Sequence, residues 1–154
     1  MITENYRKVR AAVEAAGANS PYKKEVTLLA VSKTHPVSDI MQIYEEGQRD
    51  FGENKPQELA QKYEQLPKDI RWHMIGHLQT NKIKYIIDKV CMIHSVDSLK
   101  LAQAIDHEAL KHDLVMPVLV EVNIADEPSK SGVKIEETAG ILQEISSLKN
   151  IKVK

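Results

Sequence analysis

Short runs of apolar residues alternate along the chain with longer segments in which apolar and polar residues recur at helical spacing. The short runs are rich in Val, Ile and Leu, which is typical of buried β-strands. They are expected at residues 27–33, 49–53, 71–76, 91–96 and 117–124. The longer segments are expected to form amphipathic helices, because their apolar residues fall on one face. These segments lie at residues 38–47, 54–66, 81–90, 98–112 and 136–148.

Two further elements flank this alternation. Residues 3–16 have the pattern of an amphipathic helix before the first strand, and residues 151–154 have the pattern of the start of a sixth strand. Residue types that commonly cap helices support these bounds. We expect N-caps at Thr3, Ser38, Asn54 and Asp97, and glycine stops at Gly17 and Gly47.

Strands and helices that alternate at this spacing predict βαβ units and a parallel sheet. Two architectures satisfy the pattern: an open doubly wound sheet and a (β/α)8 barrel. No glycine-rich phosphate-binding loop follows the first strand, which weakens the nucleotide-binding form of the open sheet. In the fifth strand Glu121 and Asn123 alternate with Val120 and Val122. A barrel strand can direct such polar residues inward, near the mouth of the barrel.

The number of strands is too small for a closed barrel. Five strand–helix units and the start of a sixth strand cannot complete a ring of eight strands. We therefore expect residues 1–154 to form a single partial α/β domain of the (β/α)8 TIM-barrel type, with about five β/α units present. An end at Lys154, where a strand begins, predicts a fragment or a truncated gene product.

The composition is that of an ordinary globular protein, with 42% hydrophobic and 28% charged residues. The 21 Lys and Arg residues balance 22 Asp and Glu residues, so the chain lacks the basic surface typical of nucleic-acid-binding proteins. The single cysteine, Cys91, excludes an intramolecular disulfide. The polar first residues exclude a classical signal peptide, and no apolar stretch is long enough to span a bilayer. We expect a cytoplasmic protein with no nucleic-acid or membrane partner.

Lys33 stands at the end of the first strand, in the segment "LLAVSKTHP". Strand alternation places Leu29, Val31 and Lys33 on one face. If that face lines a barrel, the amine enters the mouth, where a partly desolvated lysine becomes a nucleophile able to form a Schiff base. The alternative is a lysine that extends from the strand end into solvent. Strand chemistry alone favours this alternative.

Other polar residues follow the later strands. Asn54, His77, Ser95 and Asn123 lie at or after the ends of the second to fifth strands and are candidates for hydrogen bonds to a ligand. His73 and His77 flank a strand end instead of sharing a helical face, so they do not predict a metal site. The sequence contains no recognisable nucleophile–base triad, metal cluster or paired-carboxylate site. We assign no catalytic or metal-binding residue.

Five segments occur together in the order and spacing of one family. They are "AVSKTHP", "DFGENKPQEL", "RWHMIGHLQTNK", "IHSVDS" and "VNIADEPSKSG". In these segments the chain closely resembles the pyridoxal-phosphate homeostasis proteins, also described as proline synthase co-transcribed homologues. Their fold is similar to the N-terminal barrel of alanine racemase. The resemblance covers nearly the whole chain, from the first predicted helix to the fifth.

The resemblance implies a function and a set of site residues. The lysine of the family's "VSK" motif, which is Lys33 here, holds pyridoxal 5′-phosphate as an internal aldimine. Asn54, His77, Ser95 and Asn123 match family positions around the cofactor at the barrel mouth. The family is associated with vitamin B6 and amino-acid homeostasis and is not known for robust turnover, which implies a non-catalytic carrier. A racemase- or decarboxylase-like enzyme and a cofactor-free fragment are the alternatives.

The chain departs from the family after the fifth unit. The family continues through three more β/α units, whose loops supply a Ser- and Gly-rich phosphate site and an arginine near the cofactor ring. Without these loops we expect reduced affinity for the cofactor. The open strand edges of an unclosed barrel predict self-association.

Overall fold

The computed structural model describes residues 1–22, 25–125, 127 and 129–154. The helices are α1 (Ile2–Asn19), α2 (Val37–Glu45), α3 (Pro56–Gln65), α4 (Leu99–Lys111) and α5 (Ile135–Ser146), with a 3-10 helix, η1 (Thr80–Tyr85), before α4. The strands are β1 (Ala30–Val31), β2 (Asp50–Glu53), β3 (Arg71–Met74), β4 (Val90–Val96), β5 (Met116–Val120) and β6 (Ile151–Val153). The predicted alternation of strands and helices is confirmed.

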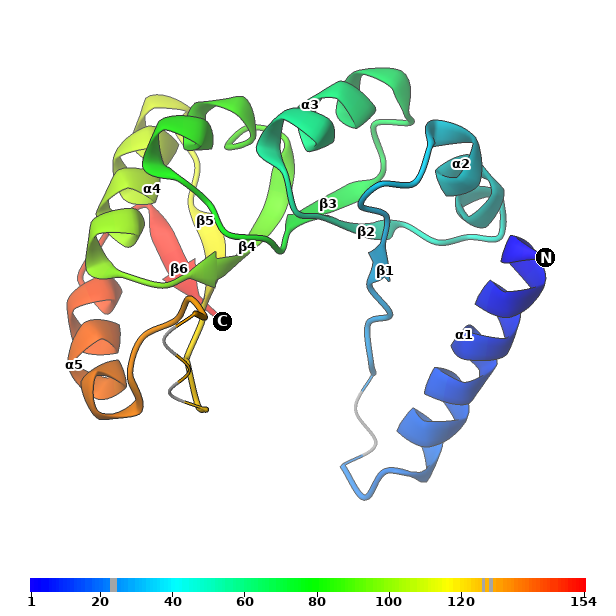
Figure 1. Ribbon diagram of the computed structural model, residues 1–154, viewed down its shortest axis with the longest axis horizontal. Coiled ribbons are helices and arrows are strands. Elements are labelled where there is room, and N and C mark those ends of the chain that lie inside the picture. Colours follow the sequence, from blue (N-terminus) through cyan, green and yellow to red (C-terminus); the bar gives the residue numbers. More distant parts are fainter. Residues whose placement is uncertain (23–24, 126, 128) are drawn as a thin grey trace.

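The six strands form one parallel sheet in the order of the sequence, from β1 to β6. Figure 1 shows the strands as an open arc, with α2 to α5 along its outer side and α1 beside β1. A doubly wound sheet reverses its strand order at a switch point, and this sheet does not. The structure therefore confirms the partial TIM-barrel-type fold and excludes the open doubly wound alternative.

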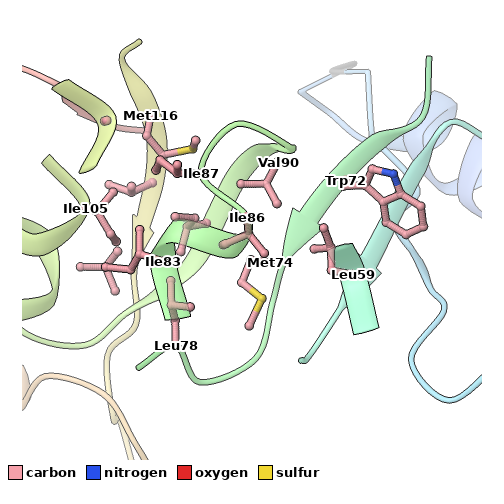
Figure 2. Packing of buried hydrophobic residues seen from close by; sticks show 14 of the residues in the cluster. Leu59, Trp72, Met74, Leu78, Ile83, Ile86, Ile87, Val90, Ile105 and Met116 are labelled. Carbon is pink, nitrogen blue, oxygen red and sulfur yellow. The ribbon is translucent and has the colours of Figure 1, made fainter. Parts of the chain in front are cut away.

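The hydrophobic core lies between the strands and the outer helices. In β3, Trp72 and Met74 are fully buried against this core, and the alternation of a strand turns Arg71 and His73 to the inner side of the arc. Figure 2 shows side chains from the strands, η1 and α4 packed together. The most completely buried residues of the core include Trp72, Met74, Ile83, Ile86, Ile87, Ile93 and Ile105. Burial on the outer face thus fixes which residues of each strand line the inner face.

The third predicted helix is shorter than expected and of a different type. Instead of an α-helix over residues 81–90, the chain forms η1 and then enters β4 at Val90. Ile86 and Ile87 both follow η1 and both are fully buried, although they are adjacent. Ile83, Ile86 and Ile87 are β-branched, and such residues lower helix propensity. Core packing therefore overrides the helical pattern here.

Most predicted caps are wrong. The observed N-caps are Met1, Pro36, Lys55 and Ser98. These replace the expected Thr3, Ser38, Asn54 and Asp97, because each of these helices begins one or two residues away from the expected position. Gly17 lies inside α1 and does not end it. Gly47, with φ of 94°, follows α2 as expected of a glycine stop.

The fifth strand also ends earlier than expected, at Val120. Beyond it, the Glu121 amide still donates to the Val96 carbonyl oxygen at 2.8 Å, and Val122 forms an isolated parallel bridge with Val133. The chain therefore leaves the regular ladder to pair with its own following loop. Glu121 and Asn123 lie beyond the strand, not within it.

None of the helices in the described ranges combines the length and the apolar character that a membrane span requires.

A hydrogen-bonded cluster of polar side chains crosses the inner face of β2, β3 and β4. His73 Nε2 lies 3.1 Å from Asp50 Oδ1, and His73 Nδ1 lies 2.9 Å from His94 Nε2. Arg71 pairs with Asp50. Burial would raise the pKa of Asp50, but its hydrogen bonds with Arg71 and His73 outweigh burial and lower it. Burial raises the pKa of the neighbouring Cys91 to about 11, which keeps it a thiol.

Replacing His94 with glutamine is expected to reduce the acid sensitivity of the fold. The pKa of His94 is lowered, first by burial and then by the charge of His73. The unfolded chain therefore binds a proton here at higher pH than the folded protein does. The free energy of unfolding consequently falls as the pH drops below about 6.5, the ordinary histidine value. His94→Gln should make this fall shallower between about pH 7 and pH 5, as measured by urea unfolding.

His107→Gln is the matched control, because His107 is an exposed histidine on α4. If His94→Gln and the parent protein lose stability equally steeply over this range, the half-buried His94 does not govern acid sensitivity.

Candidate functional site

The predicted site residues lie at one edge of the sheet. Parallel strands place their carboxyl ends together, and Lys33, Asn54 and His77 follow β1, β2 and β3. Ser95 is the penultimate residue of β4, and Asn123 follows β5. Among the described residues, no hydrogen bond joins any two of these five. They share an edge, and other residues connect the loops that carry them.

Lys33 lies in the turn after β1. Ser32 is buried with 4% of its surface exposed, whereas Val31 and Lys33 on either side are exposed. The alternation of faces expected from the sequence thus continues to Lys33, which is opposite in direction to the buried Ser32. Within the part of the chain that the structure describes, the Lys33 ammonium makes no hydrogen bond or ion pair, so it is accessible to a ligand.

A buried ion pair lies directly beneath this turn. Lys62 of α3 donates from Nζ to Glu53 Oε1 at 2.7 Å and to the Ser32 carbonyl oxygen at 2.8 Å. Ser32 Oγ donates to the same Glu53 oxygen at 2.6 Å. The Lys62 side chain is 8% exposed and the Glu53 side chain 0%. The residue before Lys33 is therefore bound to β2 and α3 through both its backbone and its side chain.

The residue after Lys33 is bound as well. Glu58 Oε1 accepts a hydrogen bond from the Thr34 amide at 2.8 Å and another from Lys62 Nζ at 2.8 Å. The hydrogen bond with Lys62 is the main cause that lowers the pKa of Glu58, and the Thr34 amide adds to it. Thr34 has φ of 65°, a conformation that is rare for a β-branched residue. Lys33 thus stands between two anchored neighbours.

Glu53, Glu58 and Lys62 were not predicted as site residues from the sequence. A signal was present, because Lys62 falls three residues after Leu59 and four before Leu66, on the apolar face of α3. A lysine on a buried helical face needs a partner, since burying an unpaired ammonium group is costly. Glu58, four residues earlier, is one partner, but the second partner on β2 required the fold to be known.

The loops after β2 and β3 touch at Asn54 and Gly76. A Cβ atom built on Gly76 would lie 2.5 Å from the Asn54 carbonyl oxygen and 2.7 Å from its Cα. This approach requires glycine, because no side chain fits there. The half-buried Asn54 is held in place by backbone packing and does not cap α3.

His77 connects the next pair of loops. Its Nδ1 lies 3.3 Å from Asp97 Oδ2, which follows β4. The His77 side chain is 59% exposed, so its other ring nitrogen can face a ligand or solvent.

The side chains of Ser95 and Asn123 differ in the hydrogen bonds that they make. Ser95 is 2% exposed, and its hydroxyl has no hydrogen-bond partner among the described residues. Asn123 donates from Nδ2 to the Glu127 carbonyl oxygen at 2.9 Å and accepts from the Glu127 amide at 3.3 Å. Asn123 therefore holds its own loop, in which residues 126 and 128 lie outside the described residues. Ser95 thus combines burial with a hydroxyl that has no hydrogen-bond partner among the described residues.

A cavity of about 320 Å³ lies elsewhere, between α1, β1 and α2. Its lining is mostly apolar and includes Tyr6, Leu29, Val31 and Ile40, but none of the five predicted site residues. Its lining also includes Ser32 and His35, so the cavity reaches the turn that carries Lys33 without including Lys33 itself. Within the described ranges, no group of three His, Cys, Asp or Glu residues is arranged to hold a metal ion.

Comparison with known proteins identifies the family in two stages. The family model for the N-terminal domain of alanine racemase matches residues 2–154. The alanine racemase of Corynebacterium glutamicum has the same fold, with a TM-score of 0.71 at 19% identity over 99% of this chain and 41% of that one. The fold and the family model thus define an alanine-racemase N-terminal-type domain.

More similar relatives narrow the family. The pyridoxal phosphate homeostasis protein of Aquifex aeolicus is 42% identical over 95% of this chain and 63% of its own length. That of Escherichia coli K12 is 34% identical over 99% of this chain and 68% of its own length. PipY of Synechococcus elongatus, solved with pyridoxal phosphate bound, superposes with a TM-score of 0.85 at 32% identity over 100% of this chain and 68% of that one.

The chain belongs to the pyridoxal phosphate homeostasis protein family, as its sequence motifs predicted. It spans about 63% of the length of the Aquifex relative.

Gly76→Ala tests the contact between the loops after β2 and β3. The added methyl group would overlap the Asn54 backbone, which cannot move without disturbing β2. We expect the free energy of unfolding to fall by about 1–3 kcal/mol. Gly140→Ala in α5 is the control, because a Cβ there meets nothing within 4 Å, and alanine should stabilise that helix by up to about 1 kcal/mol. A Gly76→Ala protein as stable as the parent in urea unfolding would contradict the proposed contact.

Proposed function

We propose that this chain binds pyridoxal 5′-phosphate covalently through Lys33 and serves in vitamin B6 and amino-acid homeostasis. The observation that carries the proposal is the exposed Lys33 ammonium, unpaired within the described residues, at the carboxyl ends of the parallel strands. Relatives in this family bear the name pyridoxal phosphate homeostasis protein, and PipY was solved with the cofactor bound.

The polar groups around Lys33 suit this cofactor. Pyridoxal phosphate supplies an aldehyde that condenses with an amine and a ring that accepts and donates hydrogen bonds. Lys33 provides the amine. Among the described residues the buried Ser95 hydroxyl has no hydrogen-bond partner, and the exposed ring of His77, which pairs with Asp97, can make a further hydrogen bond. We propose that Asn54, whose backbone packs closely on Gly76, also contacts the ligand.

A carrier role agrees better with this site than a racemase role. Racemisation needs a proton-transfer group on each face of the substrate carbanion. Lys33 supplies one amine, and the sequence contains no motif for a second group dedicated to that task. The named relatives are homeostasis proteins, whereas the similarity to alanine racemases, at 15–19% identity, concerns the fold alone. We propose that the chain holds and delivers the cofactor without sustained turnover.

A cytoplasmic setting and self-association through the free edges of β1 and β6 remain predictions.

Covalent trapping tests the proposed function. Pyridoxal phosphate is added to the 154-residue chain, the product is reduced with borohydride, and the modified lysine is found by peptide mass spectrometry. We expect one predominant adduct, on Lys33, which Lys33→Ala abolishes. Lys100→Ala, at an exposed lysine of α4, is the control and should leave the adduct intact. Adducts spread over the surface lysines would exclude a specific site, and sustained racemisation of an amino acid would contradict the carrier role.

A further inference from the structure

We propose that the buried cluster of Glu53, Lys62 and Glu58 is a positioning device for Lys33. This inference rests on the proposed function, because it assigns to these three residues the task of presenting the Lys33 amine to the aldehyde. None of them touches the cofactor in this proposal. They act through the backbone on either side of Lys33.

The first part of the device anchors the residue before Lys33. Lys62 Nζ donates to the Ser32 carbonyl oxygen at 2.8 Å, and Ser32 Oγ donates to Glu53 Oε1 at 2.6 Å. The Ser32 amide also donates to the Gly52 carbonyl oxygen at 3.0 Å, which continues the β1–β2 ladder by one bond. Three hydrogen bonds therefore fix Ser32, and with it the direction in which the next side chain leaves the sheet.

The second part anchors the residue after Lys33. The Thr34 amide donates to Glu58 Oε1 at 2.8 Å, and Thr34 has φ of 65°. A β-branched residue pays a conformational cost at positive φ, so the turn needs a compensating contact to persist. The Glu58 carboxylate provides it, because a hydrogen bond from an amide to a charged acceptor is stronger than one between neutral groups. The same Glu58 oxygen accepts from Lys62, which links both anchors to one ammonium group.

A gain in folding stability does not by itself explain why these charged residues are buried. Glu53 is fully buried and Lys62 nearly so, and Glu53 Oε2 has no hydrogen-bond partner among the described residues. Replacing a buried ion pair with apolar side chains is often neutral or stabilising. A buried, incompletely satisfied ion pair is better explained by the geometry it imposes. Within the described part of the chain, all hydrogen bonds between this cluster and the main chain reach the two residues that flank Lys33.

Variants at Glu58 separate positioning from folding. The Glu58 side chain is 24% exposed, so Glu58→Ala leaves the Lys62–Glu53 pair in place while it removes the acceptor for the Thr34 amide. Glu58→Gln keeps an oxygen at that position and is the conservative variant. Glu64→Ala is the matched control, because Glu64 lies on the same helix, is 69% exposed, and makes one loose ion pair with Lys68 at 3.9 Å.

The experiment has one readout with cofactor and one without. Pyridoxal phosphate and borohydride give the ratio of the Lys33 adduct to the adduct at exposed Lys100, and hydrogen exchange reports the protection of the Thr34 amide. In Glu58→Ala we expect the adduct ratio and the Thr34 protection each to fall about fivefold, the effect of losing one hydrogen bond. Glu58→Gln should restore most of both, and Glu64→Ala should match the parent.

The outcomes distinguish this inference from the proposed function. If the parent is labelled at Lys33 and Glu58→Ala is labelled equally well, the positioning role is overturned while cofactor binding stands. If the parent shows no preference for Lys33, the proposed function fails and the positioning role fails with it. In that case, lower protection of the Thr34 amide in Glu58→Ala would still show that Glu58 binds this amide as a structural contact. Unchanged protection would exclude that contact as well.

Discussion

Parallel pairing of neighbouring strands is the constraint on which the rest of the structure depends. Each strand from β1 to β6 pairs in parallel with the next in sequence, so every connection must cross the outer face and return to the same end. All the strand-to-helix loops consequently meet at one edge. Residues far apart in sequence become neighbours there: Asn54 packs on Gly76, and His77 pairs with Asp97. The candidate site is a consequence of strand order before it is a consequence of any single side chain.

Much of this architecture was predictable from the sequence, because the apolar segments are short, β-prone and regularly spaced. The predictions failed where local and tertiary preferences conflict. Adjacent Ile86 and Ile87 both enter the core, and the expected third α-helix shrinks to η1. Helix caps were misplaced because Met1, Pro36 and Lys55, the observed N-caps of α1 to α3, make no side-chain capping hydrogen bond, so capping chemistry does not set where these helices begin. For the site, the strand-end positions of Lys33 and His77 were predictable from periodicity, whereas the role of each remains a proposal.

The buried ion cluster was beyond the reach of the sequence for a physical reason. Glu58 and Lys62 are one helical turn apart, and that spacing is visible in the sequence. Their contacts with Ser32 and Glu53 join three elements, and nothing local indicates that a lysine of α3 should enter the β1–β2 corner. Long-range polar contacts of this kind depend on register and packing angle, which a pattern of apolar residues does not encode.

The shortness of β1 has an energetic consequence. Its regular ladder consists of Ala30 opposite Phe51 and Val31 opposite Gly52, and β1 has β2 as its neighbour on one side alone. The contacts of Glu53, Glu58 and Lys62 with Ser32 and Thr34 therefore supply much of what holds this edge to β2 and α3. Once these contacts are removed, local opening at the end of β1 should cost less free energy than opening of the central strands. The position of the candidate amine is thus coupled to the local stability of this corner, not to the global stability of the sheet.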